Sequence, residues 1–297
     1  MMSVVLITGS STGIGRLTSL TLARQGHRVY AGMRSLTSED GAATAAEMAR
    51  IAAAENLALV AVQLDVSSQE SADAAVRTVV DRAGHLDVVV NNAGHLCVGY
   101  AEAFTDDDLT HLLDINAVGA HRVNRAALPH LRAQGSGTLL YVGSTIIVST
   151  PPFLGPYAAS KAAFDTLAVA TSYEVAPFGI ETSIVMPGAI TRGTSHFPRA
   201  SRASDATVAS AYSALDPMVA RNEDATASLV RPGLDPDPQR VADEIARVLA
   251  LSRGHKPFRT VVDFTEAGVD HVMAFSDLVR ESFVHRMGFG DLLRLHE

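Results

Sequence analysis

The sequence predicts an α/β fold, a doubly wound parallel sheet within a single domain. Short β-branched runs alternate with longer alanine- and leucine-rich stretches that have helical spacing, and the short runs are continuously apolar. Such runs are typical of parallel strands that helices cover on both faces. Strands that alternate with helices of this length indicate right-handed crossovers. A chain of 297 residues can bury a large core, and no repeat or linker divides it, so we expect one domain.

The elements follow in order along the chain. Six apolar runs are the predicted strands, at residues 4–8, 28–33, 59–65, 86–91, 138–143 and 180–187. The predicted helices lie at residues 15–25, 69–83, 106–134 and 156–177, the third of them broken near Asn116. Residues 36–55 are predicted to add a loop and a helix before the third strand. Thr105 is a favourable N-cap, so the three aspartates after it indicate a helix start and not a metal site.

Two segments depart from this alternation. Residues 189–237 are rich in Ala, Ser, Thr and Pro and contain no strand-like run, which is typical of a lid or substrate-binding region. Residues 266–297 carry an amphipathic pattern that predicts a terminal helix. We expect this extension to pack on the domain formed by residues 1–265.

Composition excludes several classes of function. The net charge is −8 and no segment concentrates Lys and Arg, so nucleic acid and anionic membranes are poor partners. The eleven histidines form no HExxH or Cys/His cluster, which argues against a metal. A single cysteine, Cys97, fits a reducing compartment. With no basic leader and no apolar run near the ~18 residues that span a bilayer, we expect a soluble, cytoplasmic protein.

A glycine-rich turn follows the first predicted strand. Gly9, Gly13 and Gly15 stand in the stretch "TGSSTGIG" before the first predicted helix. Glycine permits the tight turn and lets backbone N–H groups approach a pyrophosphate at the positive end of a helix. This placement predicts dinucleotide binding, with Ser11 and Thr12 as additional hydroxyl donors.

The end of the second predicted strand bears on which dinucleotide binds. A carboxylate here is typical of NAD sites, where it binds the ribose diol. This chain has Met33 followed by Arg34. A guanidinium attracts a 2′-phosphate, so the sequence favours NADP over NAD, although Arg34 could also be an ordinary surface arginine.

The stretch "PYAASK" places Tyr157 and Lys161 on one face of a predicted helix. A tyrosine with a pKa near ~10 must fall by about 3 units to act as an acid or base at neutral pH. An ammonium ~5 Å away supplies about 3 kcal/mol at an effective dielectric constant of ~20. A positively charged nicotinamide would supply the remainder. Alone, the pair could equally be an exposed helix-face pair.

Neighbouring motifs make the chemical interpretation stronger. Ser144 ends the fifth predicted strand, where its hydroxyl could hold a substrate carbonyl. Asn116 lies at the predicted helix break, where it could hold a water that relays protons toward Lys161. The stretch "NNAG" at residues 91–94 ends the fourth predicted strand and is suited to bracing the backbone beside a cofactor.

With these motifs the chain resembles the short-chain dehydrogenase/reductase family, in its shorter single-domain branch. The motifs occur in family order over residues 4–190, as TGxxxGIG at 8–15, Asp65, NNAG at 91–94, Asn116, Ser144, YxxxK at 157–161 and Pro187-Gly188. The stretches "VYAGMRS" and "SYEVAPFGIETSIVMPG" are similar to those of hydroxysteroid and retinol dehydrogenases.

The resemblance implies a Rossmann-type fold and hydride transfer between NADP(H) and a carbonyl or secondary alcohol. It implies that Tyr157 is the general acid/base, that Lys161 lowers its pKa and binds the nicotinamide ribose, that Ser144 positions the substrate oxygen, and that Asn116 supports a proton relay. The implied cofactor-binding residues are Gly9, Ser11, Thr12, Gly13, Ile14, Gly15, Arg34, Asp65, Val66, Asn91, Ala93, Gly94, Tyr157, Lys161, Pro187, Gly188 and Ile190.

The chain departs from the family pattern at three places. Thr12 stands where many NADP-preferring members carry a basic residue, so the NADP preference depends on Arg34. Arg192 stands near the position of a threonine that often holds the nicotinamide carboxamide, and the threonines here are Thr191 and Thr194. The C-terminal tail is longer than the family minimum.

The expected substrate is a small-molecule carbonyl or alcohol, most simply a lipophilic ketone. Phe153, Leu154 and Phe197 are candidates to line an apolar pocket. A reductase of 3-oxoacyl thioesters and a non-catalytic, NADP-sensing regulator are the alternatives. By analogy with the family, a homodimer or homotetramer would form through residues 105–134 and 156–177.

Overall fold

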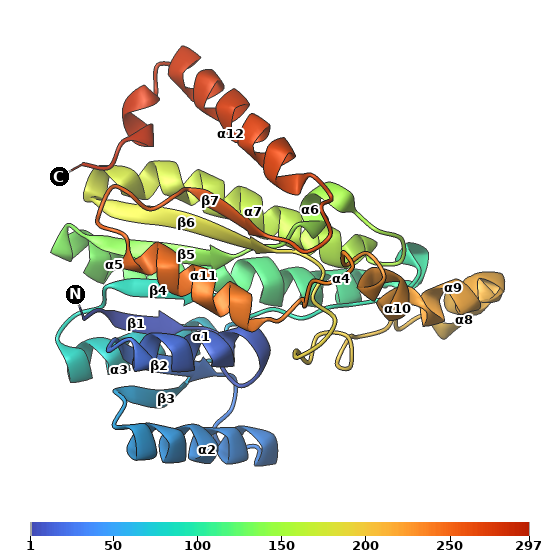
Figure 1. Cartoon of the computed structure of the whole chain (residues 1–297), viewed down its shortest axis with the longest axis horizontal. Helices are drawn as coiled ribbons and strands as arrows, with labels where there is room; N and C mark the ends of the chain where they lie inside the picture. Colours follow the sequence, from blue (N-terminus) through green and yellow to red (C-terminus); the bar gives the residue numbers. More distant parts are fainter. Residues whose placement is uncertain (1, 297) are drawn as a thin grey trace.

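The computed structural model describes residues 2–296, and its framework is a seven-stranded sheet with the order β3-β2-β1-β4-β5-β6-β7 (Figure 1). All neighbouring strands pair in parallel. The strands are β1 (Val4–Ile7), β2 (Arg28–Met33), β3 (Leu59–Gln63), β4 (Val88–Asn91), β5 (Gly137–Val142), β6 (Ile180–Pro187) and β7 (Arg259–Val262). This is the predicted doubly wound α/β fold, so the predicted class is confirmed.

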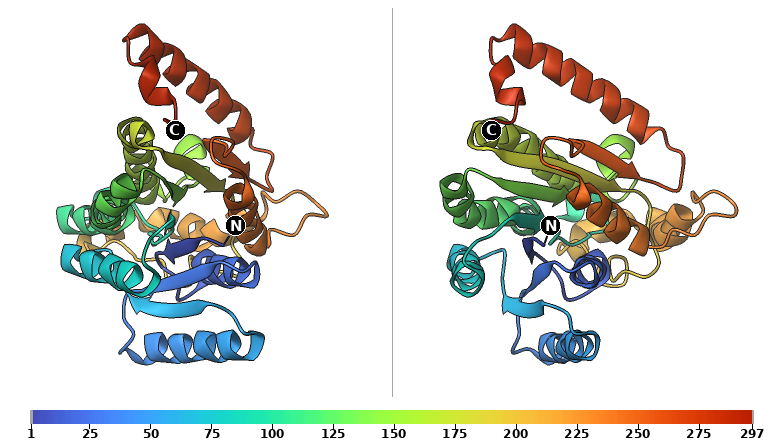
Figure 2. Two further views of the ribbon diagram at one scale, coloured as in Figure 1. Left: turned by 90° about the vertical axis from the view of Figure 1, so that its left-hand side faces the viewer. Right: turned by 60° about the vertical axis from the view of Figure 1, so that its left-hand side comes forward.

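Helices cover both faces of the sheet because the strands are apolar on both sides. On one face lie α3 (Gln69–Ala83), α5 (Gly119–Gln134) and α7 (Gly155–Val175), and on the other lie α1 (Gly13–Arg24) and α11 (Gln239–Ala250). The two faces hold separate apolar clusters, and the views in Figure 2 show the three layers. The predicted helix in residues 36–55 is α2 (Glu39–Glu55), which packs beside the outer strand β3.

The predicted break near Asn116 is confirmed. Here α4 (Asp106–Leu113) passes into a π-helical turn, Asp114–Val118, before α5 begins. Thr105 and Asp108 form a reciprocal capping box at the start of α4, which confirms the N-cap interpretation of the aspartates. The π-turn places Asn116 inside the protein, where its side chain is fully buried.

The sequence analysis missed one strand, misplaced an end of two others by two residues, and displaced ends of β1 and β5 by one residue. Strand β7 pairs with β6 in the register Ile184↔Arg259 to Pro187↔Val262. It has four residues, begins with a charged one and is only half-buried, so it lacks the continuous apolar run by which the other strands were found. Strand β3 ends at Gln63, not 65, and β4 begins at Val88, not 86.

Residues 189–237 form the predicted irregular region, which contains no strand within the described chain. Three short helices, α8 (Ala206–Ala211), α9 (Asp216–Ala220) and α10 (Asn222–Ala227), lie beyond the carboxyl edge of the sheet (Figure 1). The remaining short elements are η1 (Ala101–Ala103), α6 (Ile146–Ser149), η3 (Ala176–Phe178), η4 (Ser213–Leu215) and η5 (Gly290–Leu293). Among residues 2–296, no helix is both long and apolar enough to cross a membrane.

The C-terminal extension contains α12 (Val269–Arg286), which contacts the body along one side only. Val269, Met273 and Val284 are buried there. Figures 1 and 2 show the helix slanting away from α7. The residues of its other side are exposed and include Val272, Phe275, Leu278, Val279 and Phe283.

A buried ion-pair cluster holds β7, α7 and α12 together. The Arg259 guanidinium makes a two-pronged pair with Asp165 of α7, and its Nη2 is 3.2 Å from Asp165 Oδ2. Arg259 Nε lies 3.3 Å from Asp277 Oδ2 of α12. The side chains of Arg259 and Asp165 are only 6% and 12% exposed, so each charge depends on the other for solvation.

We expect Arg259→Leu to lower the free energy of unfolding by about 3 kcal/mol or more, because it leaves Asp165 buried without its partner. Arg231→Leu is the matched control, since the Arg231–Glu266 pair is more than half exposed and should contribute less than about 1 kcal/mol. Urea unfolding of both variants measures the difference, and equal losses would contradict the assignment.

Candidate active site

The predicted functional residues gather at the carboxyl edge of the sheet, around the loops that follow β1, β4, β5 and β6. Strand order reverses between the neighbours β1 and β4. From β1 the chain adds β2 and β3 toward one edge of the sheet, and from β4 it adds β5, β6 and β7 toward the other edge. Crevices for ligands form at such a switch point in open α/β sheets. The lid helices α8–α10 lie beyond this same edge (Figure 1).

The glycine turn between β1 and α1 has the geometry of an anion cradle. Gly9 and Gly13 have φ angles of +68° and +54°, a region that residues with a side chain rarely adopt. A Cβ on Gly15 would lie 2.4 Å from the Gly9 carbonyl oxygen. Within the described chain, the N-cap Thr12 gives α1 no side-chain hydrogen bond, so the first N–H groups of the helix are available to a phosphate.

Two residues hold this turn against the loop after β4. Thr8 Oγ1 accepts hydrogen bonds from the backbone N–H groups of Asn92 and Ala93, each at 2.9 Å. Asn92 Nδ2 donates to the carbonyl oxygens of Thr8 at 2.9 Å and Gly9 at 3.2 Å. The NNAG stretch therefore braces the glycine turn through its second asparagine, whereas the sequence analysis named Asn91.

The side chain of Asn91 points into the protein. Its Nδ2 donates to Asn124 Oδ1 at 3.0 Å, and Asn124 Nδ2 donates to the Tyr141 hydroxyl at 2.8 Å. These contacts join β4, α5 and β5. The Asn91 amide nitrogen serves this network, whereas its Oδ1 is buried without a hydrogen-bond partner among residues 2–296.

Asp65 and Val66 lie in the turn between β3 and α3. The Asp65 carboxylate accepts from both the backbone N–H and the hydroxyl of Ser67. The Val66 side chain packs against Gly119, where a Cβ would approach to 2.8 Å. Asp65 therefore stabilises the turn before α3, and Val66 packs this turn on α5.

Asn116 ties the loop after β4 to α7. Its Oδ1 accepts from the backbone N–H of His95, and its Nδ2 donates to the His95 carbonyl and to Ser160 Oγ, all at 2.9 Å. A Cβ on Gly94 would lie 3.1 Å from Asn116 Oδ1 and 3.9 Å from Lys161 Nζ. Asn116, Gly94 and Lys161 thus meet at one point, although the side chain of Asn116 is fully engaged.

Tyr157 and Lys161 occupy the first turns of α7, and both are buried. Lys161 Nζ donates to the Val142 carbonyl at 3.0 Å. Burial lowers the pKa of Lys161 to about 8. Burial also raises the pKa of Tyr157, and a hydrogen bond with the Ser144 hydroxyl opposes that rise.

The sequence analysis expected the ammonium of Lys161 and a positively charged nicotinamide together to make the phenol acidic, whereas the raised pKa of Tyr157 reflects the protein's groups alone. In this protein the desolvation of Tyr157 outweighs the favourable polar contacts. The protein's own groups therefore leave Tyr157 protonated at neutral pH. An acidic phenol would need the added positive charge of an oxidised nicotinamide.

The segment after β6 covers the crevice. Gly188 N donates to the Val262 carbonyl, and the Pro187 carbonyl accepts from Thr145 N, so the start of the segment is fixed to its neighbours. Ile190 is buried against the cluster on the α1 face. Arg34, at the end of β2, and Arg192 are exposed.

Thr194 lies against the glycine turn. A Cβ on Gly13 would be 3.6 Å from Thr194 Cβ. The Thr194 hydroxyl oxygen is buried and has no hydrogen-bond partner among residues 2–296. A buried hydroxyl without a partner beside a glycine cradle fits a bound phosphate-containing cofactor. Arg192, by contrast, points to solvent.

An apolar cluster surrounds the ring of Tyr157. It includes all three residues that the sequence suggested for a pocket, Phe153, Leu154 and Phe197. The lid contributes Val219, and the Tyr100 hydroxyl fixes the lid by donating to Asp216 Oδ1 at 2.7 Å. One polar group enters this cluster, because His196 Nε2 lies 3.3 Å from the Tyr157 hydroxyl oxygen.

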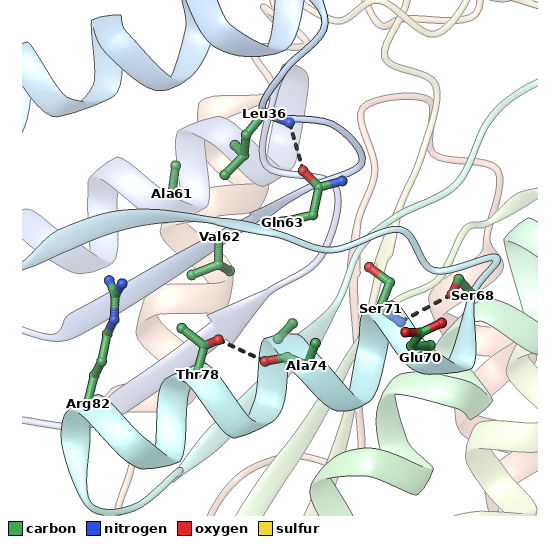
Figure 3. A pocket seen from close by; sticks show the side chains of 11 residues that line it. Leu36, Ala61, Val62, Gln63, Ser68, Glu70, Ser71, Ala74, Thr78 and Arg82 are labelled. Carbon is green, nitrogen blue, oxygen red and sulfur yellow. Dashed lines mark hydrogen bonds between the residues drawn. The ribbon is translucent and has the colours of Figure 1, made fainter.

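A separate cavity of about 440 Å³ lies between β3 and α3 (Figure 3). Gln63 crosses one end, where it accepts from Leu36 N and donates to the Arg34 carbonyl, and Arg82 lies at the other. The catalytic candidates do not line it. Across residues 2–296, no group of His, Cys, Asp and Glu side chains is arranged to hold a metal ion.

Comparison with known proteins gives one consistent result. The sequence model described as short chain dehydrogenase matches residues 3–203. A short-chain dehydrogenase of known crystal structure from Streptomyces avermitilis is 29% identical and superposes with a TM-score of 0.74, over 98% of this chain and 99% of its own.

Two curated relatives extend this result. Human 17-beta-hydroxysteroid dehydrogenase type 1 is 37% identical over 63% of this chain and 57% of its own length. The 3-ketodihydrosphingosine reductase of Bacteroides thetaiotaomicron is 31% identical over 64% of this chain and 65% of its own. The chain thus spans less than two thirds of the length of these two relatives.

We expect Lys161→Met to change how stability depends on pH. Because burial lowers the pKa of Lys161 to about 8, the folded state releases this proton before the unfolded state does, and the wild type gains stability as pH rises from 8 toward 10.5. Relative to Lys161→Met, that gain should reach about 3 kcal/mol. Urea unfolding of both proteins at pH 7 and pH 10 measures it, and parallel pH dependences would contradict it.

Proposed function

The chain belongs to the short-chain dehydrogenase family, and from this premise we propose that it transfers a hydride between NADP(H) and a carbonyl or secondary alcohol. The observation that carries the proposal is the meeting of three groups beside the glycine turn. Tyr157 and Lys161 are buried one helical turn apart on α7, and the Ser144 hydroxyl lies near enough to lower the pKa of Tyr157. These groups suit acid–base work on a substrate oxygen.

In reduction, Tyr157 donates its proton to the carbonyl oxygen, and Ser144 holds that oxygen by a second hydrogen bond. The cofactor, when bound, supplies the hydride and, once oxidised, a positive charge. Lys161 then favours the phenolate that remains, because its positive charge lies on the same face of α7, one turn from Tyr157. Asn116 keeps the loop after β4 seated on α7, and a relay through it would use its backbone carbonyl.

The cofactor would lie along the carboxyl edge from β2 to β6. The glycine turn would hold the pyrophosphate, Asp65 and Val66 would border the adenine, and Thr194 would donate its free hydroxyl to a phosphate or to the carboxamide. Arg34 is exposed at the end of β2 and would pair with a 2′-phosphate. This is why we propose NADP as the preferred cofactor.

For the substrate we propose a lipophilic ketone or its alcohol. The wall around Tyr157 is built from Leu96, Leu154, Phe197 and similar side chains, which favour an apolar body attached to the reacting oxygen. The hydroxysteroid and ketosphingoid substrates named for the two curated relatives are of this kind.

We further propose a homodimer or homotetramer, since α4 and α7 expose Leu109, Leu113 and Leu167. We also propose a cytoplasmic location.

Tyr157→Phe should abolish NADPH consumption with a panel of aliphatic, aromatic and steroid ketones, because the proton donor is lost. NADPH binding should stay within about twofold, since the phenyl ring keeps the buried packing. The decrease in NADPH absorbance with time measures consumption, and a fluorescence titration with NADPH measures binding. An unmutated protein that binds NADPH but reduces no ketone would favour a regulatory, cofactor-sensing role instead.

Arg34→Ala tests the cofactor. We expect NADPH binding to weaken by roughly 10-fold or more and NADH binding to change by less than about twofold, because only NADPH carries the 2′-phosphate that pairs with the guanidinium. The exposed Arg50 of α2 gives a matched control, Arg50→Ala. Equal effects of Arg34→Ala on both cofactors would defeat the assignment.

A further inference from the structure

His196 is a polar side chain in an apolar pocket, and it contacts the reacting group. Its Nε2 lies 3.3 Å from the Tyr157 hydroxyl oxygen, and its ring meets the tyrosine ring edge-on with centroids 5.9 Å apart. The Tyr157 ring that it meets belongs to the apolar cluster, together with Leu154 and Phe197, which follows His196 in the chain. A polar group in such a place needs a hydrogen-bonding purpose, because its burial is unfavourable.

The backbone holds His196 in this position. Ser201 N donates to the Leu96 carbonyl and Val98 N donates to the Ser201 carbonyl, each at 3.0 Å, which fastens the segment to the loop after β4. Just before Ser201, Arg199 N donates to the Ser195 carbonyl, and this hydrogen bond closes a turn that contains His196. Phe197 packs into the cluster next to it. The imidazole is therefore preorganised beside Tyr157.

We propose that His196 is a catalytic residue that donates a hydrogen bond from Nε2–H to the reacting oxygen of the substrate, as a third donor beside Tyr157 and Ser144. This inference rests on the proposed function. An oxygen can lie at a normal hydrogen-bond distance of ~2.8 Å from both the Tyr157 hydroxyl and His196 Nε2, since those two atoms are only 3.3 Å apart. The Tyr157 hydroxyl and His196 Nε2 can therefore both reach one substrate oxygen.

The imidazole is neutral in this role. Burial and, to a smaller extent, the positive charge of Lys161 lower the pKa of His196 to about 4. The ring thus keeps one N–H at neutral pH and adds no charge to the pocket. In the reaction the proton that moves to the substrate comes from Tyr157, and His196 keeps its own proton throughout.

A third donor favours the transition state over the bound ketone. A carbonyl oxygen has two lone pairs, which Tyr157 and Ser144 occupy. As hydride reaches the carbon, the oxygen becomes alkoxide-like and gains a third lone pair and negative charge. The hydrogen bond from His196 is therefore strongest at that stage, and its loss should lower kcat with little effect on KM.

The test compares His196→Gln, which retains an N–H donor, with His196→Leu, which fills similar space without one. Ser195→Ala is the matched control on the same turn, because the Ser195 carbonyl that closes the turn is retained. With a ketone that the wild type reduces, His196→Leu should lower kcat by roughly 10- to 100-fold and KM by less than about threefold. His196→Gln should recover most of kcat, and Ser195→Ala should match the wild type.

The outcomes separate the two proposals. If His196→Leu retains full kcat, or if His196→Gln is as impaired as His196→Leu, the donor role is overturned while the reductase function stands. A rise in KM alone would assign His196 to substrate binding and would also overturn the donor role. If the wild type reduces no ketone, the proposed function itself fails.

Discussion

The parallel pairing of β1 with β4 is the constraint on which the site depends. It brings the glycine turn and the loop after β4 to the same edge of the sheet, where Thr8 and Asn92 join them by four hydrogen bonds. Two residues after Asn92, the absence of a side chain on Gly94 leaves room for Asn116, because a Cβ there would lie 3.1 Å from Asn116 Oδ1. Lys161, the lysine of the proposed mechanism, is held on the other side of this loop by α7 and by its own hydrogen bond to the Val142 carbonyl.

Burial sets the protonation states of Tyr157 and Lys161, on which the proposed chemistry depends. Desolvation favours neutral forms, so it lowers the pKa of Lys161 and raises that of Tyr157. A buried pair in this state holds its proton on the phenol, which suits a donor in reduction. A nearby positive charge is then needed to stabilise the phenolate after the proton leaves, so acid–base function and cofactor charge are coupled.

Features that depend on local pattern were predictable from sequence, and features that depend on distant contacts were not. Continuous apolar runs gave six strands, and the capping residue Thr105 and the break at Asn116 were found from local residues. Strand β7 was not predicted because its first residue, Arg259, is charged. Its burial is made possible by the ion pair with Asp165, which is distant in the sequence. The opposite roles of Asn91 and Asn92 depend on which way each side chain points at the end of β4, and the motif alone does not encode that.

The sequence analysis did not identify His196 for a related reason. Two parts of the fold differ in what they contribute to the candidate site. The sheet and its loops carry the residues that we propose for proton transfer and cofactor contacts, and these residues belong to recognisable motifs. The segment after β6 supplies the pocket wall, and its sequence has neither strand nor long-helix periodicity. Its single polar contact with Tyr157 is fixed by the bridge between Ser201 and the loop after β4. The frame can therefore stay constant while changes in this segment alter both the shape around the substrate and the number of donors on its oxygen.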